Sequence, residues 1–338
     1  MTATEPALRV GIFGTGGWAR RTHIPHLLDL GAQIVCLCDT HAEAVATAGE
    51  EFGIETRYTD GHQMLATEKL DVLYSCVPAF ARTDIEATAA RSGIHLFSEK
   101  PQSTSMRVAR QIAAAVDAGG GLSTVCFRER YRPLFQEARR LLADKQIVHA
   151  RFQSPGGLPS QERRRDQDRA WGHWMAKAGS RAFDWGVHAV DYLRFMTGLD
   201  VAKAQAFYHD PAHYTTPLSS VFQLAFTTGA TAQLSFVSAM ATPPPNEPWF
   251  TIYYEGGYLS VFRYERIEQN GEIVYEADDF DPWHEQDRVF LDAVQRHDPT
   301  ALLNDYADGL KSLAPVLACW ESAKRGGQVI DVAAFGAR

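Results

Sequence analysis

Short apolar runs alternate with stretches of helical periodicity through the first third of the chain. Five apolar runs that end at glycine or polar positions predict buried strands: residues 7–13, 33–38, 70–77, 94–98 and 122–127. Between them, apolar residues at helical spacing predict helices at 18–30, 41–52, 84–92 and 104–117. Strands that alternate with helices of this length predict a parallel, doubly wound sheet.

The pattern changes near residue 127. Alternating or β-branched and aromatic segments predict strands at 148–153, 221–227, 230–238 and 250–262, with long helices at 184–196 and 305–324. We therefore expect an α/β protein of two domains. Residues 1–126 form the doubly wound parallel sheet, and residues 127–338 form an α+β domain with a mostly antiparallel, open sheet.

Composition narrows the classes of protein that the chain fits. Its 338 residues, 45% hydrophobic and 22% charged, suit two globular domains. The net charge of −8 argues against nucleic acid as the main partner. No secretion signal and no membrane-spanning stretch is visible, and five cysteines are few and odd in number. We expect a cytoplasmic protein with reduced thiols in its core.

A glycine-rich turn follows the first predicted strand. It runs Gly14-Thr15-Gly16-Gly17-Trp18-Ala19 and fits the dinucleotide fingerprint, because it also opens a helix and because Asp39 ends the next strand. Gly14 makes the turn, Gly16 admits a pyrophosphate, and Asp39 accepts hydrogen bonds from ribose hydroxyls. Asp39 also repels a 2′-phosphate, and Thr40 and His41 offer no arginine to hold one, which favours NAD over NADP.

Three further segments resemble the Gfo/Idh/MocA oxidoreductases, a family that includes glucose–fructose oxidoreductase and inositol dehydrogenase. They are Ser98-Glu99-Lys100-Pro101, the run from Phe127 to Pro133, and the run from Gly179 to Asp191, which contains an Asp-x-Gly-x-His element. The resemblance covers essentially the whole chain and implies a Rossmann domain followed by a substrate domain. It also implies catalytic roles for Lys100, Asp184 and His188, the last two also contacting substrate.

The residue chemistry agrees with those roles. Asp184 and His188 are four positions apart and share a helix face. Oxidation of an alcohol carbon needs a base for the hydroxyl proton, which His188 or Lys100 could supply, and the sequence leaves that choice open. Glu99 and Lys100 are expected to contact the cofactor, where Glu99 orients the lysine loop and Pro101 fixes it. The family's usual Thr-Pro-Asn reads Val77-Pro78-Ala79 here, and Val77 and Pro78 are expected to line the cofactor.

The substrate side departs from the family pattern. The usual glycine triplet reads Ala178-Gly179-Ser180, bulky Arg181 follows it, and Arg82 stands where a histidine is common. Arg128 is a candidate substrate contact that suits an anionic ligand. The charged run 161–169, together with the nearby Trp171 and Trp174, is a candidate substrate loop. The alternative for the charged run is a solvated surface whose charges pair with one another.

These features predict an NAD(P)-dependent oxidoreductase acting on a sugar, polyol or sugar derivative. Two alternatives stay open: a redox-cycling glycosidase that uses the same residues and returns the hydride, and a non-catalytic cofactor-binding regulator. No metal is predicted, because among the histidines only His23 and His26 are three positions apart, and these are expected on the surface of the phosphate-binding helix. The open sheet face is expected to form a homodimer or homotetramer interface.

Overall fold

The structure is a computed structural model, and it describes residues 6–158, 181–211, 214, 217–239, 242, 244 and 246–337. The chain divides into two compact units. The first comprises Met1–Arg128 and Asp281–Leu310, and the second Glu129–Phe280 and Lys311–Arg338. The segment 281–310 thus groups with the N-terminal part of the chain, whereas the predicted domain boundary at 126/127 places it in the second domain.

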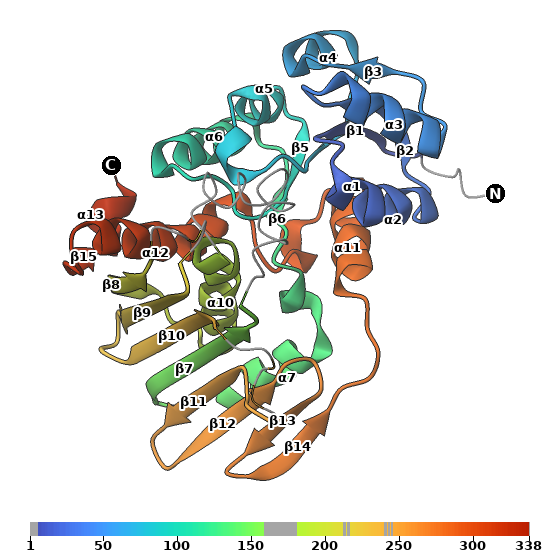
Figure 1. The fold of residues 1–338 in the computed structure, drawn as a ribbon. Coiled ribbons are helices and arrows are strands. Elements are labelled where there is room, and N and C mark those ends of the chain that lie inside the picture. Colours follow the sequence, from blue (N-terminus) through green and yellow to red (C-terminus); the bar gives the residue numbers. More distant parts are fainter. Residues whose placement is uncertain are drawn as a thin grey trace. The chain divides into compact units, whose positions relative to one another are not determined.

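The first unit holds a six-stranded parallel sheet in the order β3-β2-β1-β4-β5-β6 (Figure 1). Its strands are β1 (Arg9–Phe13), β2 (Gln33–Cys38), β3 (Arg57–Tyr58), β4 (Val72–Ser75), β5 (His95–Ser98) and β6 (Ser123–Val125). Its longer helices are α2 (His23–Asp29), α3 (Ala42–Phe52), α4 (Gly61–Thr67), α5 (Ile85–Arg91), α6 (Met106–Gly119) and α11 (Pro282–Arg296). The predicted doubly wound parallel sheet is confirmed.

One predicted helix is divided in two. The periodic segment 18–30 forms a short α1 (Gly17–Arg21) and then α2, with Thr22 between them at φ −125° and ψ −80°. The second helix therefore starts at His23, which turns that side chain into the unit instead of continuing the first helix's surface.

Aromatic residues join the two chain segments of the first unit. Tyr74 of β4 stacks on Phe97 of β5 with ring centroids 4.3 Å apart, and Phe290 of α11 meets both rings edge-on at 6.1 and 5.6 Å. All three side chains are fully buried. Burial of such rings is the main stabilising term, so α11 is part of the core of this unit.

The second unit is built on a nine-stranded sheet in the order β14-β13-β12-β11-β7-β10-β9-β8-β15. The strands are β7 (Ile147–Gly156), β8 (Val201–His209), β9 (Ser219–Phe226), β10 (Thr231–Ser238), β11 (Phe250–Tyr254), β12 (Gly257–Phe262), β13 (Arg266–Gln269), β14 (Glu272–Glu276) and β15 (Ile330–Asp331). Only the β7–β10 pair is parallel among them, which confirms the predicted mostly antiparallel sheet.

Helix α10 (Arg181–Thr197) lies along one face of this sheet, against β7 and β10 (Figure 1). Buried and partly exposed positions alternate along β7, β9 and β10, because one face packs under helices and the other does not. The unit also contains α7 (Pro133–Leu142), most of α12 (Tyr306–Lys324) and α13 (Val332–Gly336).

The five cysteines are free thiols, and four of them are buried, as predicted for core cysteines. Burial raises the pKa of the Cys76 and Cys126 thiols to about 12. Within the described part of the chain, no helix combines the length and the apolar character that a bilayer crossing requires.

Candidate functional site

The glycine turn after β1 is shaped by a close backbone approach. Gly14 has φ +95°, and a Cβ there would lie 2.8 Å from the backbone nitrogen of Val77, two residues after β4. At Gly16, by contrast, a Cβ would meet no heavy atom within 4 Å, so its backbone faces open space. Ala19 is buried at 1% exposure and keeps the following helix close to the sheet. The fingerprint residues and Val77 are thus brought to one sheet edge.

Asp39 ties the end of β2 to that turn. Its Oδ2 accepts a hydrogen bond from the Thr15 backbone N–H at 2.9 Å, and its Oδ1 accepts one from the His41 N–H at 3.0 Å. Its side chain is 16% exposed, and among the described residues its only ion-pair partner is the exposed His41. The open backbone at Gly16 and the fixed carboxylate of Asp39 fit a dinucleotide, with the phosphates at the turn and a ribose at Asp39.

Lys100 stands at the carboxyl end of β5, in a loop that its neighbour holds. The backbone N–H of Lys100 donates to Glu99 Oε2 at 2.9 Å, and the peptide bond to Pro101 is cis. Glu99 is buried, and its Oε1 accepts hydrogen bonds from Trp18 Nε1 at 2.6 Å and His23 Nε2 at 2.9 Å. Glu99, which is predicted to orient the lysine loop, thus connects that loop to the first two helices.

The expectation that His23 lies on the helix surface is wrong. His23 is fully buried, and its Nδ1 bonds both carboxylate oxygens of Asp287 on α11 at 3.1 Å. Burial opposes charge on His23, but Asp287 and Glu99 outweigh it and raise the pKa of His23 well above its usual value. Burial would raise the pKa of Glu99, yet His23, Lys100 and Trp18 lower it to about 2. The cluster is an imidazolium between two carboxylates.

Arg82 is a second buried cation beneath the lysine loop. It pairs with Glu86, donates to the backbone carbonyl of Glu99, and donates to Ser75 Oγ at 2.7 Å. The sequence marked Arg82 only as a departure from the family pattern. Its contacts show that it holds the backbone just before Lys100.

Arg128 lies in the first unit with little exposure, at 7%. Its guanidinium stacks 4.2 Å from the ring centroid of Trp283, which lies 5.9 Å from the ring of Trp18. Trp283 is a residue that the sequence did not indicate. The stack places Arg128 beside Trp283 of α11, and Trp283 in turn lies near Trp18 of α1, the helix that follows the glycine turn.

The second unit carries the other two predicted catalytic residues. Asp184 and His188 lie one turn apart on α10, and His188 is 2% exposed with the rings of Trp185 and Tyr192 at 5.6 and 5.5 Å. The same helix is anchored by Asp191, which accepts a hydrogen bond from Arg130 Nη2 at 2.6 Å. Lys100 belongs to the first unit, and Asp184 and His188 to the second. Trp171, Trp174 and the run 161–169 lie outside the described residues.

Comparison with known proteins gives matches over both units. Residues 8–127 match a family model described as "Oxidoreductase family, NAD-binding Rossmann fold", and residues 135–260 match the "GFO/IDH/MocA C-terminal domain". D-apiose dehydrogenase of Paraburkholderia graminis is 30% identical over 221 residues, which cover 61% of this chain and 53% of that protein. D-xylose 1-dehydrogenase (NADP(+)) 2 of Haloferax volcanii is 24% identical over 94% of this chain and 98% of its own.

The fold has close counterparts among solved structures. The WlbA dehydrogenase from Bordetella pertussis, in complex with NADH and UDP-GlcNAcA, superposes with a TM-score of 0.78 at 23% identity, over 96% of this chain and 99% of that chain. Alignments with several curated relatives span about half the length of those proteins. Because the two family models together match most of its residues, the chain belongs to the Gfo/Idh/MocA family of oxidoreductases.

Proposed function

We propose that this protein is an NAD-dependent dehydrogenase that oxidises a hydroxyl-bearing carbon of a sugar, polyol or sugar derivative. The observation that carries the proposal is the lysine loop: Lys100 follows a parallel strand of an NAD-binding unit and is held there by buried Glu99, His23 and Arg82. Relatives named as sugar and polyol dehydrogenases, such as D-apiose dehydrogenase and scyllo-inositol 2-dehydrogenase, support the substrate class.

The residues of the chain divide the work of the reaction. Bound NAD would accept the hydride from the alcohol carbon. The turn from Gly14 to Ala19, Asp39, Val77 and Pro78 would hold that cofactor. Lys100 or His188 takes the hydroxyl proton, which lets the carbon–oxygen bond become a carbonyl as the hydride leaves. Asp184, on the same helix as His188, orients the substrate or the imidazole.

Replacement of Lys100 tests the assignment. Lys100→Met is expected to lower kcat by roughly 10²- to 10⁴-fold, the usual contribution of acid–base catalysis, while NAD affinity changes little. The measurement is NADH formation over a panel of sugars, polyols and sugar acids, with NAD affinity determined by calorimetry. Lys69→Met, which removes an amine from the loop before β4, is the matched control and should keep wild-type turnover.

Three outcomes separate the hypotheses. NADH formation that depends on Lys100 supports the dehydrogenase. Cleavage of a glycoside without net NADH formation would establish the redox-cycling glycosidase instead. A wild-type protein that binds neither NAD nor NADP would overturn both.

Cofactor preference depends on Asp39. Its carboxylate would accept hydrogen bonds from ribose hydroxyls and repel a 2′-phosphate, so we expect NAD to bind at least about 10-fold more tightly than NADP. Asp39→Asn should weaken NAD binding and reduce the ratio of NAD affinity to NADP affinity, because it removes the charge that repels the 2′-phosphate. Calorimetry with both nucleotides measures this, and an unchanged ratio in the variant would show that Asp39 does not select the cofactor.

A further inference from the structure

Arg181 begins α10 at the end of two parallel strands. Its Nη2 donates to Ser154 Oγ of β7 at 2.8 Å, and its Nη1 reaches Ser238 Oγ and the Val237 carbonyl of β10 at 3.5 Å. These partners are neutral. They fix the position of the guanidinium one turn before Asp184 without neutralising its charge.

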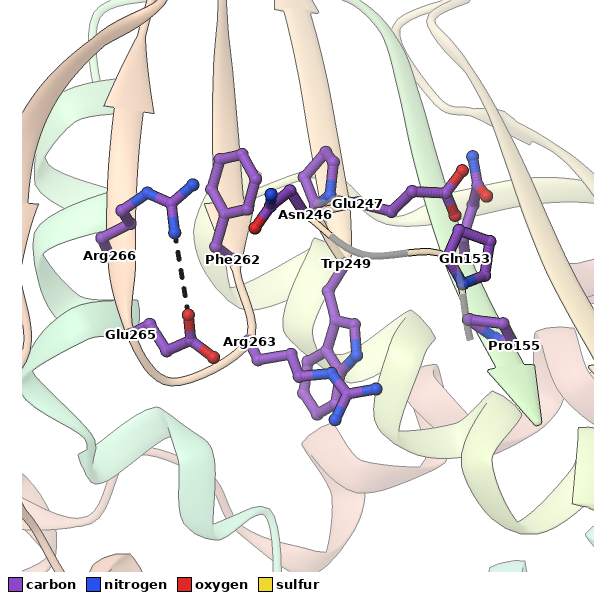
Figure 2. Close-up of a pocket in the computed structure, with 11 residues that line it drawn as sticks. Gln153, Pro155, Asn246, Glu247, Trp249, Phe262, Arg263, Glu265 and Arg266 are labelled. Carbon is purple, nitrogen blue, oxygen red and sulfur yellow. Dashed lines mark ion pairs between the residues drawn. The ribbon is translucent and has the colours of Figure 1, made fainter. Parts of the chain in front are cut away.

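A second guanidinium lies at the same end of β7. Arg263 lies in the turn directly after β12, and its guanidinium carbon is 5.6 Å from the ring centroid of Trp249 (Figure 2). Arg263 and Pro155 line one surface hollow, and the Pro155 carbonyl also accepts a weak hydrogen bond from Arg181 at 3.5 Å. Arg263 has φ +46°, a left-handed backbone that is uncommon for a residue with a side chain.

The two charges have no acidic counterpart among the described residues. No carboxylate of the described chain lies within ion-pair distance of Arg181 or Arg263, although ion pairs are frequent elsewhere among the described residues. Burial and the neighbouring charge of Arg263 together lower the pKa of Arg181.

The acidic groups of the hollow are directed elsewhere. Glu265 pairs with Arg266 at 3.7 Å, and Glu247 lies beside Gln153, whose amide can donate to it at 3.1 Å (Figure 2). Arg181 is half-buried and held by neutral partners, and Arg263 is exposed and stacked on the Trp249 ring. Two such guanidinium groups without acidic partners are an arrangement that binds an anion.

We propose that Arg181 and Arg263 form a subsite for an anionic group, a carboxylate or a phosphate, on the substrate. The inference rests on the proposed function and narrows its substrate class to acidic sugar or polyol derivatives. Ring contacts connect this arginine pair to the proposed catalytic helix. Trp249 lies 5.7 Å from Trp185, and Trp185 lies 5.6 Å from His188. An anion at the pair would anchor one end of a substrate whose hydroxyl carbon is near α10.

The test compares matched neutral and acidic probes on the full chain loaded with NAD. Calorimetry measures binding of L-threitol against L-tartrate, and of D-glucose against D-glucuronate and D-glucose 6-phosphate. We expect an acidic probe to bind at least about 10-fold more tightly than its neutral partner, with an affinity that falls as salt is added. The glucuronate and phosphate arms decide which anion the pair accepts.

Variants assign that preference to the arginine pair. Arg263→Gln and Arg181→Gln should each weaken binding of the acidic probe by about 10- to 100-fold and that of the neutral probe by less than about 3-fold. Arg263→Gly also removes the charge but relieves the left-handed backbone, so its melting temperature should not fall. Arg266→Gln, which removes a guanidinium already paired with Glu265 and Glu268, is the control and should leave the acidic preference unchanged.

Equal binding of acidic and neutral probes, or an equal loss of both in Arg263→Gly, would overturn the arginine subsite. Calorimetric binding does not require hydride transfer. Anion binding without any turnover on acidic substrates would therefore count against the proposed function alone, and turnover of neutral substrates only would count against the subsite alone.

Discussion

His23 shows how one buried side chain can determine the geometry of the proposed catalytic loop at Lys100. Its imidazolium lies between Glu99, which bonds the Lys100 backbone, and Asp287 of α11. Removing the cation leaves two buried carboxylates uncompensated, so His23→Asn should destabilise the protein by about 3–5 kcal/mol in urea unfolding. His62→Asn breaks an exposed pair with Asp84 and should cost less than about 1 kcal/mol. Equal effects of the two substitutions would contradict the buried ion pair.

The same cluster predicts how stability depends on pH. The pKa of Glu99 falls from 4.5 to about 2 on folding, so its contribution is complete above pH 4.5 and is lost as the pH falls toward 2. The pKa of His23 is raised, so its contribution is complete below 6.5 and is lost only as the pH rises through the raised value. Glu99→Gln should therefore lower the free energy of unfolding, on the order of 3 kcal/mol near neutrality, by an amount that shrinks in acid. Urea unfolding of both proteins over this range measures the difference, and a difference that does not change with pH would argue against a charged Glu99.

At the scale of the element, the turn between β1 and α1 depends on Gly14 for two reasons. Its φ of +95° disfavours any side chain, and a Cβ would collide with the Val77 backbone. Gly14→Ala should therefore weaken NAD binding by at least about 10-fold and cost more than about 1 kcal/mol of stability. Gly53→Ala is the matched control, because Gly53 has φ +69° but open space around it. If both substitutions cost the same stability and spare NAD affinity, the collision is unimportant.

Elements with a local signal were predictable from the sequence, and those defined by distant contacts were not. The strand–turn–helix at Gly14 and the Asp184–His188 helix could be recognised from spacing and motif alone. The break at Thr22 could not, because the apolar periodicity runs through it, and only the burial of His23 against Asp287 shows why the helix restarts there. The arginine pair was equally hidden, since 82 positions separate Arg181 from Arg263 and only the sheet brings both to the end of β7.

At the scale of the whole molecule, the first unit is completed by a segment that follows eight of the nine strands of the second unit's sheet along the chain. Phe290 of α11 is fully buried against Tyr74 and Phe97, and Phe250 is an equally buried ring in the second unit, 4.8 Å from Phe152. Truncation of either ring should cost about 3–5 kcal/mol. The two substitutions should destabilise different parts of the chain, and amide hydrogen exchange measured on separate peptides shows which part each one affects. Phe290→Ala should speed exchange in β4 and β5 and weaken NAD binding, while β7 and β11 stay protected. Phe250→Ala should speed exchange in β7 and β11, while β4 and β5 stay protected and NAD affinity is kept. Faster exchange in β7 and β11 after Phe290→Ala, with β4 and β5 unchanged, would contradict the assignment of α11 to the cofactor unit.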